Sequence, residues 1–385
     1  MGSGIIEYRT ARHNCLATPL LKISNIMPTL KIKTIETEVV EVNHRGNWLF
    51  VKVSADDGTV GVGEASHGRD DGQVQHIIDT LKPALIGWNP FQLEAFRQRF
   101  YRDTESHTYH TALSGIEQAM CDLVGKALNI PSYQLLGGKC RERIRLYANI
   151  NRATIDRSPS GFASNAERAV AEGFTAIKCA PFDDVSTANI SSGSLTPAIC
   201  AGIDRIRTIR AAIGDDIDLM VDCHSRFNPG ILIQVAKELE DLRLFWIEDA
   251  VPLDNLDAFA YISRSIGIPI ATGERLRTSE AFDRLLRHAA VDYILPDVKH
   301  VGGISGLKKI AILAAARNVM VTPHNPSGPV ATAASVQCMA SVPNFAILEY
   351  AWGEIAWRAD LVSPPEKIVD GFIEVPDRPG LGITL

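Results

Sequence analysis

Three acidic residues recur at a constant spacing in the second half of the chain. Asp222, Glu248 and Glu274 each follow a short apolar run, and they stand 26 residues apart. One strand plus one helix accounts for such a period, so the carboxylates would meet at the ends of neighbouring parallel strands. Carboxylates that close repel one another unless a hard cation lies among them. The spacing therefore predicts a Mg²⁺ site, although each residue alone could cap a helix or pair with Arg226 or Arg275.

Two histidines stand close to this predicted metal site. His224 lies two residues after Asp222, and strand alternation would put both side chains on one face if the strand continued that far. Asp297 and His324 follow two later apolar runs, so they would meet at adjacent strand ends. An Asp beside a His fixes its tautomer and stabilises the imidazolium, which makes the imidazole a better base. The alternatives are a hydrogen-bonded surface role for His224 and a helix cap for Asp297.

Two further ionisable residues end predicted strands at the same mouth. Lys178 could bind a substrate carboxylate, and Glu349 could contact a substrate hydroxyl or hydrogen-bond to the substrate in its protonated form. A purely structural role remains the alternative for both residues.

Eight short apolar segments, separated by amphipathic stretches, would position these side chains. Such alternation is typical of an α/β fold with a parallel sheet, and eight strands close a barrel whose C-terminal mouth collects catalytic residues. The polar segment 183–196 is expected to be a loop on that side. The predicted strands are 146–150, 176–179, 219–223, 245–248, 269–273, 293–296, 319–323 and 346–349.

The earlier part of the chain has a different pattern. Alternation over 30–62 predicts an antiparallel ribbon with a turn at Asp56-Asp57-Gly58, and helical periods follow at 72–87, 90–103 and 111–128. We therefore expect an α+β domain, a barrel and a tail that packs back on the first domain, after an N-terminal extension without clear periodicity. The expected boundaries are 1–28 for the extension, 29–144, 145–360 and 361–385.

Length and composition are consistent with this division. A chain of 385 residues exceeds the roughly 250–300 residues at which one core stops growing. The formal net charge of -6, without a basic stripe, argues against nucleic acid as a partner. No apolar run approaches the roughly 20 residues that cross a membrane. The 7 cysteines lack a CxxC pair, which favours a reducing cytoplasm over a disulfide framework or a zinc site.

Several longer motifs resemble the mandelate racemase subgroup of the enolase superfamily over about 30–385. They are Ala-Leu-Ser-Gly-Ile-Glu-Gln-Ala-Met from Ala112, Leu-Leu-Gly-Gly from Leu135, Pro-Asp-Val from Pro296 and Pro-Gly-Leu-Gly from Pro379. The resemblance implies a (β/α)7β TIM-like barrel with an N-terminal α+β capping domain that the C-terminal tail completes. It also implies Mg²⁺ ligation by the three carboxylates, and α-proton abstraction next to a carboxylate by the Asp297–His324 pair, giving an enediolate.

Within the subgroup, the motifs around His224 and His324 are similar to the galactonate dehydratase type. That resemblance implies that His224 is a general acid and that an aldonate or aldarate loses water to give a 2-keto-3-deoxy acid. The alternative is a racemase, epimerase or cycloisomerase that uses the same enediolate. Racemases and several other dehydratases carry Lys-x-Lys where this chain has Lys178-Cys179-Ala180, so in a racemase the second base would have to be His224 or Lys178. A non-catalytic binding barrel and a metal-dependent aldolase are more distant alternatives.

In the family, two capping-domain loops select the substrate, and they correspond here to 43–48 and 66–73. Arg45 and His67 are the candidate substrate-binding residues in these loops, alongside Lys178 and Glu349. The loops do not name the sugar acid. Family members often form symmetric assemblies, so we expect a homo-oligomer.

Overall fold

The first part of the chain forms a three-stranded antiparallel sheet packed against helices. The structure is a computed structural model that describes residues 30–44, 46–102 and 104–385. The strands are β1 (Ile32–Asn43), β2 (Gly46–Ala55) and β3 (Val60–Glu64), in the order β1-β2-β3. This confirms the predicted ribbon. The helices that follow are α1 (Asp71–Leu85), α2 (Leu93–Phe100) and α3 (His107–Leu128), which begins four residues before the predicted helix.

Strand β2 contributes to two cores at once. Leu49, Val51 and Val53 pack with the helices of the first domain. The alternate residues Trp48 and Phe50 belong to the main core, which continues into the second half of the chain. Because successive strand residues point to opposite faces, one strand can connect the two parts of the molecule.

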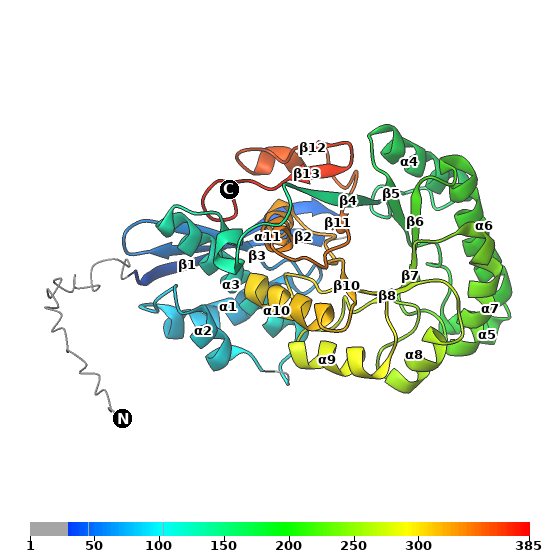
Figure 1. The fold of residues 1–385 in the computed structure, drawn as a ribbon, viewed down its shortest axis with the longest axis horizontal. Helices are drawn as coiled ribbons and strands as arrows, with labels where there is room; N and C mark the ends of the chain where they lie inside the picture. The colour runs from blue at the N-terminus through cyan, green and yellow to red at the C-terminus, as the bar shows by residue number, and fades with distance from the viewer. Residues whose placement is uncertain (1–29, 45, 103) are drawn as a thin grey trace, which may run out of the picture.

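The second part is a parallel sheet whose strands alternate with helices, and the helices α4 and α6 to α9 surround it on the outside (Figure 1). All eight predicted strands are present. They are β4 (Arg143–Asn149), β5 (Ala176–Cys179), β6 (Asp218–Asp222), β7 (Trp246–Glu248), β8 (Ile270–Thr272), β9 (Tyr293–Ile294), β10 (Met320–Val321) and β11 (Leu348–Tyr350). Most are shorter than predicted, because the apolar runs extend beyond the residues that form ladder hydrogen bonds.

Neighbouring strands pair in sequence order from β4 to β10, and β11 pairs in parallel with β4. On the other side, Val321 of β10 forms a parallel bridge with Phe345, just before β11. The connecting helices are α4 (Pro159–Ala171), α6 (Leu195–Ile213), α7 (Pro229–Leu239), α8 (Leu256–Ser263), α9 (Ser279–His288), α10 (Gly303–Ala315) and α11 (Pro329–Ala340).

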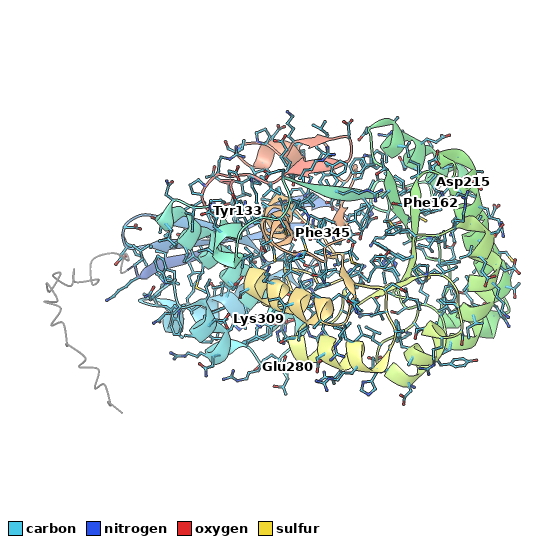
Figure 2. All side chains as sticks on the ribbon, in the orientation of Figure 1. Tyr133, Phe162, Asp215, Glu280, Lys309 and Phe345 are labelled. Carbon is cyan, nitrogen blue, oxygen red and sulfur yellow. The ribbon has the colours of Figure 1, made fainter. Side chains whose placement is uncertain are left out.

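A small separate core lies on the inner face of the parallel strands. It contains Tyr147, Ala176, Met220, Trp246, Ala271, Leu295 and Ile347. Six of these residues stand two positions before a polar residue at a strand end, for example Met220 before Asp222 and Trp246 before Glu248. Strand alternation puts both members of each pair on the same face. The apolar layer therefore forms the floor on which the polar strand ends stand, and the side chains fill the space within the sheet (Figure 2).

One local prediction was wrong. The segment 183–196, expected to be a loop, contains the short helix α5 (Thr187–Ser192). Ser186 and Asn189 form a capping box there, in which each side chain satisfies the other residue's backbone N–H. A run of Ser, Thr and Asn suggests a loop from composition, but the same residue types also cap helices.

The tail lies against both parts of the molecule. Its strands β12 (Ile368–Val369) and β13 (Phe372–Glu374) form a hairpin, and β13 pairs antiparallel with β4. Further along, the backbone N–H of Leu381 donates to Asp122 of α3 at 2.7 Å, and the hydroxyl of Tyr133 donates to Asp377 at 2.7 Å. Among the described residues, no helix is long and apolar enough to cross a membrane.

The first part of the chain contacts the second chiefly through α10 and α11, which lie beside it (Figure 1). Lys309 on α10, labelled in Figure 2, faces α2, and its Nζ lies 2.5 Å from the carboxylate of Glu94. This ion pair is largely exposed, so it contributes little to stability.

A buried carboxylate of α3 holds the start of α10. Glu117 is fully buried and accepts hydrogen bonds from the backbone N–H groups of Ile304 at 2.7 Å and Ser305 at 3.1 Å. A carboxylate at a helix N-terminus satisfies N–H groups that have no partner within the helix. Gly303 allows this approach, since its φ is 71° and an added Cβ would lie 1.9 Å from Glu117 Oε2.

Glu64 at the end of β3 makes the equivalent contact with α11. It is fully buried and accepts hydrogen bonds from Gly328 N and Ala331 N, both at 2.8 Å. The hydroxyl of Ser66 donates to the same carboxylate at 2.8 Å. Two buried acids of the first domain thus hold the two helices that follow β9 and β10.

We predict that Glu117→Ala lowers the free energy of unfolding by about 1–3 kcal/mol for each backbone N–H left buried without a partner. Urea denaturation followed by circular dichroism measures the change. Glu38→Ala is the control, because Glu38 is an exposed β1 residue in a surface ion pair with Lys52. Equal denaturation midpoints for the two variants would contradict the role of Glu117.

Candidate active site

The three predicted metal-binding carboxylates converge at the ends of β6, β7 and β8. Asp222 and Glu248 are directly paired residues of β6 and β7. Glu274 lies two residues after β8, beyond Gly273, whose φ of 118° turns the chain. One oxygen from each of the three carboxylates lies within 4.8 Å of the others. Three carboxylate oxygens at this separation are a suitable donor set for a small hard cation such as Mg²⁺.

Lys178 of β5 lies beneath this cluster. Its Nζ forms ion pairs with Glu248 and, at 2.8 Å, with Glu349 Oε1, and it lies 3.7 Å from Asp222 Oδ2. Burial opposes its charge, but Glu248 and Glu349 together raise the pKa of Lys178 well above its usual range. The lysine is therefore charged and is only 1% exposed. Its ion-pair partners are carboxylates of the protein, and it also lies 5.4 Å from the centroid of the Tyr147 ring. The predicted contact with substrate stays a prediction.

The cluster carries more carboxylates than one lysine can neutralise. Burial raises the pKa of Glu248 to about 8 and, with the nearby acids Asp249 and Asp222, raises the pKa of Glu274 well above its usual range. Burial also opposes ionisation of Asp222, yet His224 and Lys178 hold the pKa of this carboxyl below its usual range. A divalent cation would relieve the repulsion that raises the first two pKa values.

His324 and Asp297 form the hydrogen-bonded pair that the sequence predicted. Nδ1 of His324 lies 2.8 Å from Asp297 Oδ2, and Nε2 lies 3.3 Å from Glu274 Oε2. Burial opposes ionisation of Asp297, but the charge of Lys299 and the hydrogen bond from His324 hold its pKa below the usual range. The ionised carboxylate therefore accepts the Nδ1 proton and leaves Nε2 facing the carboxylate cluster.

His224 reaches the cluster by a route that the sequence did not indicate. Strand β6 ends at Asp222, and His224 has a left-handed backbone with φ of 46°. Strand alternation therefore does not position the side chain. The turn places Nε2 of His224 3.1 Å from Asp222 Oδ2, and Asp222 raises the pKa of the imidazole. With 41% of its side chain exposed, His224 lies between the carboxylates and solvent.

Glu349 is held from several sides. Besides Lys178, it accepts hydrogen bonds from Asn149 Nδ2 at 2.6 Å and from the backbone N–H of Asn325 at 2.8 Å. Burial opposes its ionisation, but Lys178 and His324 lower the pKa of Glu349. We therefore expect a carboxylate here, which differs from the protonated form considered in the sequence analysis.

A cavity of about 220 Å³ lies between the first domain and the parallel sheet. His324 and the predicted substrate-binding residue His67 both line it. Arg45, the other predicted loop residue, lies outside the described residues, although its neighbour Gly46 lines the cavity. The complete lining is Gly46, Asn47, Trp48, Ser66, His67, Gly68, His107, Arg152, Lys299, His300, His324 and Pro326.

Four polar lining residues lie outside the two predicted loops and were not predicted from the sequence. Arg152, Lys299 and His300 follow β4 and β9 within a few residues, so the rule that strand ends carry the site could have included them. His107 is the first residue of α3 and belongs to no strand end. Only the folded contact between domains brings it to the cavity.

The fold and site together define a two-domain α/β protein whose polar centre lies at the C-terminal ends of parallel strands, beneath an antiparallel domain. Residues 161–385 match the enolase C-terminal domain-like family, and residues 27–137 match the N-terminal domain of mandelate racemase / muconate lactonizing enzyme. The chain belongs to the mandelate racemase/muconate lactonizing group of the enolase superfamily.

Known proteins are similar over nearly the whole chain. The D-xylonate dehydratase of Haloferax volcanii is 36% identical over 366 residues, which cover 92% of this chain and 87% of that protein. The D-galactonate dehydratase of Verminephrobacter eiseniae is 32% identical over 88% of each chain. The crystal structure of a mandelate racemase/muconate lactonizing enzyme from Sulfitobacter sp. superposes with a TM-score of 0.84 at 31% identity, covering 92% of this chain and 93% of the other.

We predict that Mg²⁺ raises the melting temperature of the protein and that Glu274→Gln reduces this effect. A ligand at 100 times its Kd stabilises the folded state by about 2.7 kcal/mol. Differential scanning fluorimetry over a Mg²⁺ titration measures the shift. Glu280→Gln, which changes an exposed acid on α9, is the control and should respond like the wild type. An undiminished shift in Glu274→Gln would exclude this carboxylate as a ligand.

We also predict that Mg²⁺ binds more tightly as the pH rises from 6 to 8. Because burial, together with the neighbouring acids Asp249 and Asp222, raises the pKa of Glu274 well above its usual range in the metal-free protein, a proton must leave before this carboxylate can ligate. Competition with one proton weakens binding about tenfold per pH unit below the pKa. Calorimetric titrations in two buffers of different ionisation enthalpy measure the released protons. Identical heats in both buffers would contradict proton release.

Proposed function

We propose that this protein is a Mg²⁺-dependent dehydratase of a sugar acid, either an aldonate or an aldarate. The observation that carries the proposal is the position of His324, whose Nδ1 is held by Asp297 while Nε2 faces the three-carboxylate cluster. The names of two relatives, dehydratases of D-xylonate and of D-galactonate, support the same reaction class.

Asp222, Glu248 and Glu274 would hold the ion, since their oxygens are close together and two of them have raised pKa values. When bound there, Mg²⁺ would supply positive charge for the negative charge that develops on the substrate carboxylate. The buried ammonium of Lys178 forms ion pairs with Glu248 and Glu349 and so orients these two carboxylates without help from solvent.

In the proposed reaction, Nε2 of His324 removes the proton from the α-carbon. The Asp297 carboxylate holds Nδ1–H at 2.8 Å, which orients the ring and stabilises the imidazolium that forms. The electron pair of the broken C–H bond enters the carboxylate as an enediolate.

His224 would then protonate the departing β-hydroxyl. Nε2 of His224 lies 3.1 Å from Asp222 Oδ2, and in the metal-free protein Asp222 raises the pKa of this imidazole, which favours the protonated form that an acid needs. The C–O bond breaks, water leaves, and the resulting enol tautomerises to a 2-keto-3-deoxy acid. The proton taken by His324 and the proton given by His224 balance the loss of one water molecule.

The contacts of Lys178 disfavour the racemase alternative. A racemase needs a base on each face of the α-carbon, and the ammonium of Lys178 is bound to Glu248 and Glu349. Ala180 stands where racemases carry their second lysine. Lys178 is therefore a poor second base, so racemisation would need His224 in that role, whereas elimination uses His224 as the acid.

We further infer that the eight parallel strands form a closed (β/α)7β barrel under the capping domain, which the tail completes. The pairing of β11 with β4 and the bridge from Val321 to Phe345 support closure. The homo-oligomer and the cytoplasmic location stay predictions.

We predict that the Mg²⁺-loaded protein converts one or more aldonic or aldaric acids to 2-keto-3-deoxy acids. His324→Asn should lower kcat by about 10³-fold or more and should also abolish exchange of the α-proton with deuterated solvent. His224→Asn should lower water loss by about 10²–10⁴-fold while the α-proton still exchanges, because general acid catalysis contributes about that much. A keto-acid assay and NMR in deuterated water measure the two steps.

His288→Asn is the matched control, since His288 is an exposed histidine of α9. Loss of both steps in His224→Asn would contradict its assignment as the acid. Proton exchange without water loss for every acid would overturn dehydration and favour the racemase or cycloisomerase.

A further inference from the structure

Three histidines from separate parts of the chain meet in the wall of the cavity. His67 follows β3, His107 begins α3, and His300 follows β9. The centroid of the His107 ring lies 4.3 Å from that of the His300 ring and 4.7 Å from that of the His67 ring. All three pairs of rings meet edge to face. The cluster lines the same cavity as His324, and the capping domain contributes His67 and His107 while the parallel-strand domain contributes His300.

Hydrogen bonds determine which nitrogen of His300 carries its proton. The hydroxyl of Thr111 donates to the backbone carbonyl of His107 at 2.9 Å, so its oxygen is an acceptor toward Nδ1 of His300, also at 2.9 Å. Nδ1 is therefore protonated, and Nε2 of the neutral ring is an acceptor. Nε2 lies 3.7 Å from Asp297 Oδ2, beyond hydrogen-bond distance.

The other two rings have unsatisfied nitrogens. Nε2 of His107 and Nε2 of His67 are buried and have no hydrogen-bond partner among the described residues. Burial lowers the pKa of His107 to about 3 and that of His300 well below its usual range, so both rings are neutral near pH 7. A buried polar atom without a partner costs free energy, which a ligand that pairs with it would recover.

Neutral imidazoles suit hydroxyl groups better than a second carboxylate. Each ring offers one donor and one acceptor, as a hydroxyl does. The two described cations in the cavity wall are already paired, Lys299 with Asp297 at 3.2 Å and Arg152 with the buried Glu354. Neither is therefore free to neutralise an incoming anion without losing its partner.

We propose that His107 and His300 form a subsite that recognises hydroxyl groups at the end of the sugar acid remote from its carboxylate. Both residues lie outside the two loops, 43–48 and 66–73, that the sequence singled out for substrate selection. The inference rests on the proposed function, because it takes the carboxylate end of the substrate to lie at the metal-binding cluster. It identifies His107 as a specificity-determining residue that α3 contributes.

The test compares acids of different length on the Mg²⁺-loaded enzyme. The probes are D-glycerate, which lacks remote hydroxyls, the five-carbon D-xylonate, and the six-carbon D-galactonate and D-glucarate. For the wild type, we expect kcat/KM to be higher for the longer aldonates than for D-glycerate and for the doubly charged D-glucarate. His107→Phe should reduce the ratio of kcat/KM for D-xylonate to that for D-glycerate by about 10–100-fold, as expected when a hydroxyl loses its polar partner.

His107→Gln keeps a donor and an acceptor, and it should recover part of the ratio. His76→Gln changes an exposed histidine of α1 and should leave both the ratio and the activity unchanged. Calorimetric binding of D-xylonate and D-glycerate to the same Mg²⁺-loaded variants gives a second readout that does not require turnover. It applies to His107→Gln if His107→Phe does not fold.

An unchanged ratio in both His107 variants would overturn the subsite, and so would an equal loss for D-glycerate, which indicates a structural role. A higher kcat/KM of the wild type for D-glucarate than for the aldonates would contradict a subsite that recognises hydroxyl groups. If no acid loses water but D-xylonate binds more weakly to His107→Phe than to the wild type, the proposed function fails while the subsite stands.

Discussion

The repulsion among buried carboxylates around a single lysine is the constraint on which the site depends. Asp222, Glu248 and Glu349 all approach Lys178, whose ammonium is almost completely buried. Burying several acids with one base is unfavourable unless their geometry is fixed and their remaining oxygens are satisfied. The parallel strands fix the geometry, and the apolar layer that includes Met220 and Trp246 keeps water out from below. The strands and the apolar layer together hold the buried charges in a fixed arrangement.

Much of this centre could be predicted from the sequence because its spacing repeats with the strands. The 26-residue interval reflects one βα unit, and Asp222 and Glu248 are register partners in the structure. The contact between Asp297 and His324 followed from the same logic of adjacent strand ends. Strand lengths were less predictable, since β9 and β10 have two paired residues each within longer apolar runs. At His224 the strand has ended and the backbone is left-handed. Strand alternation predicted that His224 lies near Asp222, but a turn brings the two side chains together.

The cluster of His67, His107 and His300 shows why the remaining features of the site could not be predicted from the sequence. His67, His107 and His300 come from three segments with no shared period, and only the packing of α3 against the second domain brings their rings together. Their chemistry also depends on burial, which makes the imidazoles of His107 and His300 neutral. Neither long-range packing nor burial can be read from spacing in a single sequence. The helix α5, whose composition resembles a loop, is a smaller example of the same difficulty.

The contacts of Glu64 and Glu117 have a consequence for how this architecture can diversify. Glu117 binds α10, which follows Asp297 in the chain, and Glu64 binds α11, which follows His324. The same hydrogen bonds therefore fix the capping domain to the segments that carry the proposed base. A capping domain transplanted from a relative would have to bring carboxylates at both positions, or the recipient helices would be left with unpaired N–H groups. Recombination between relatives is therefore constrained at these two junctions.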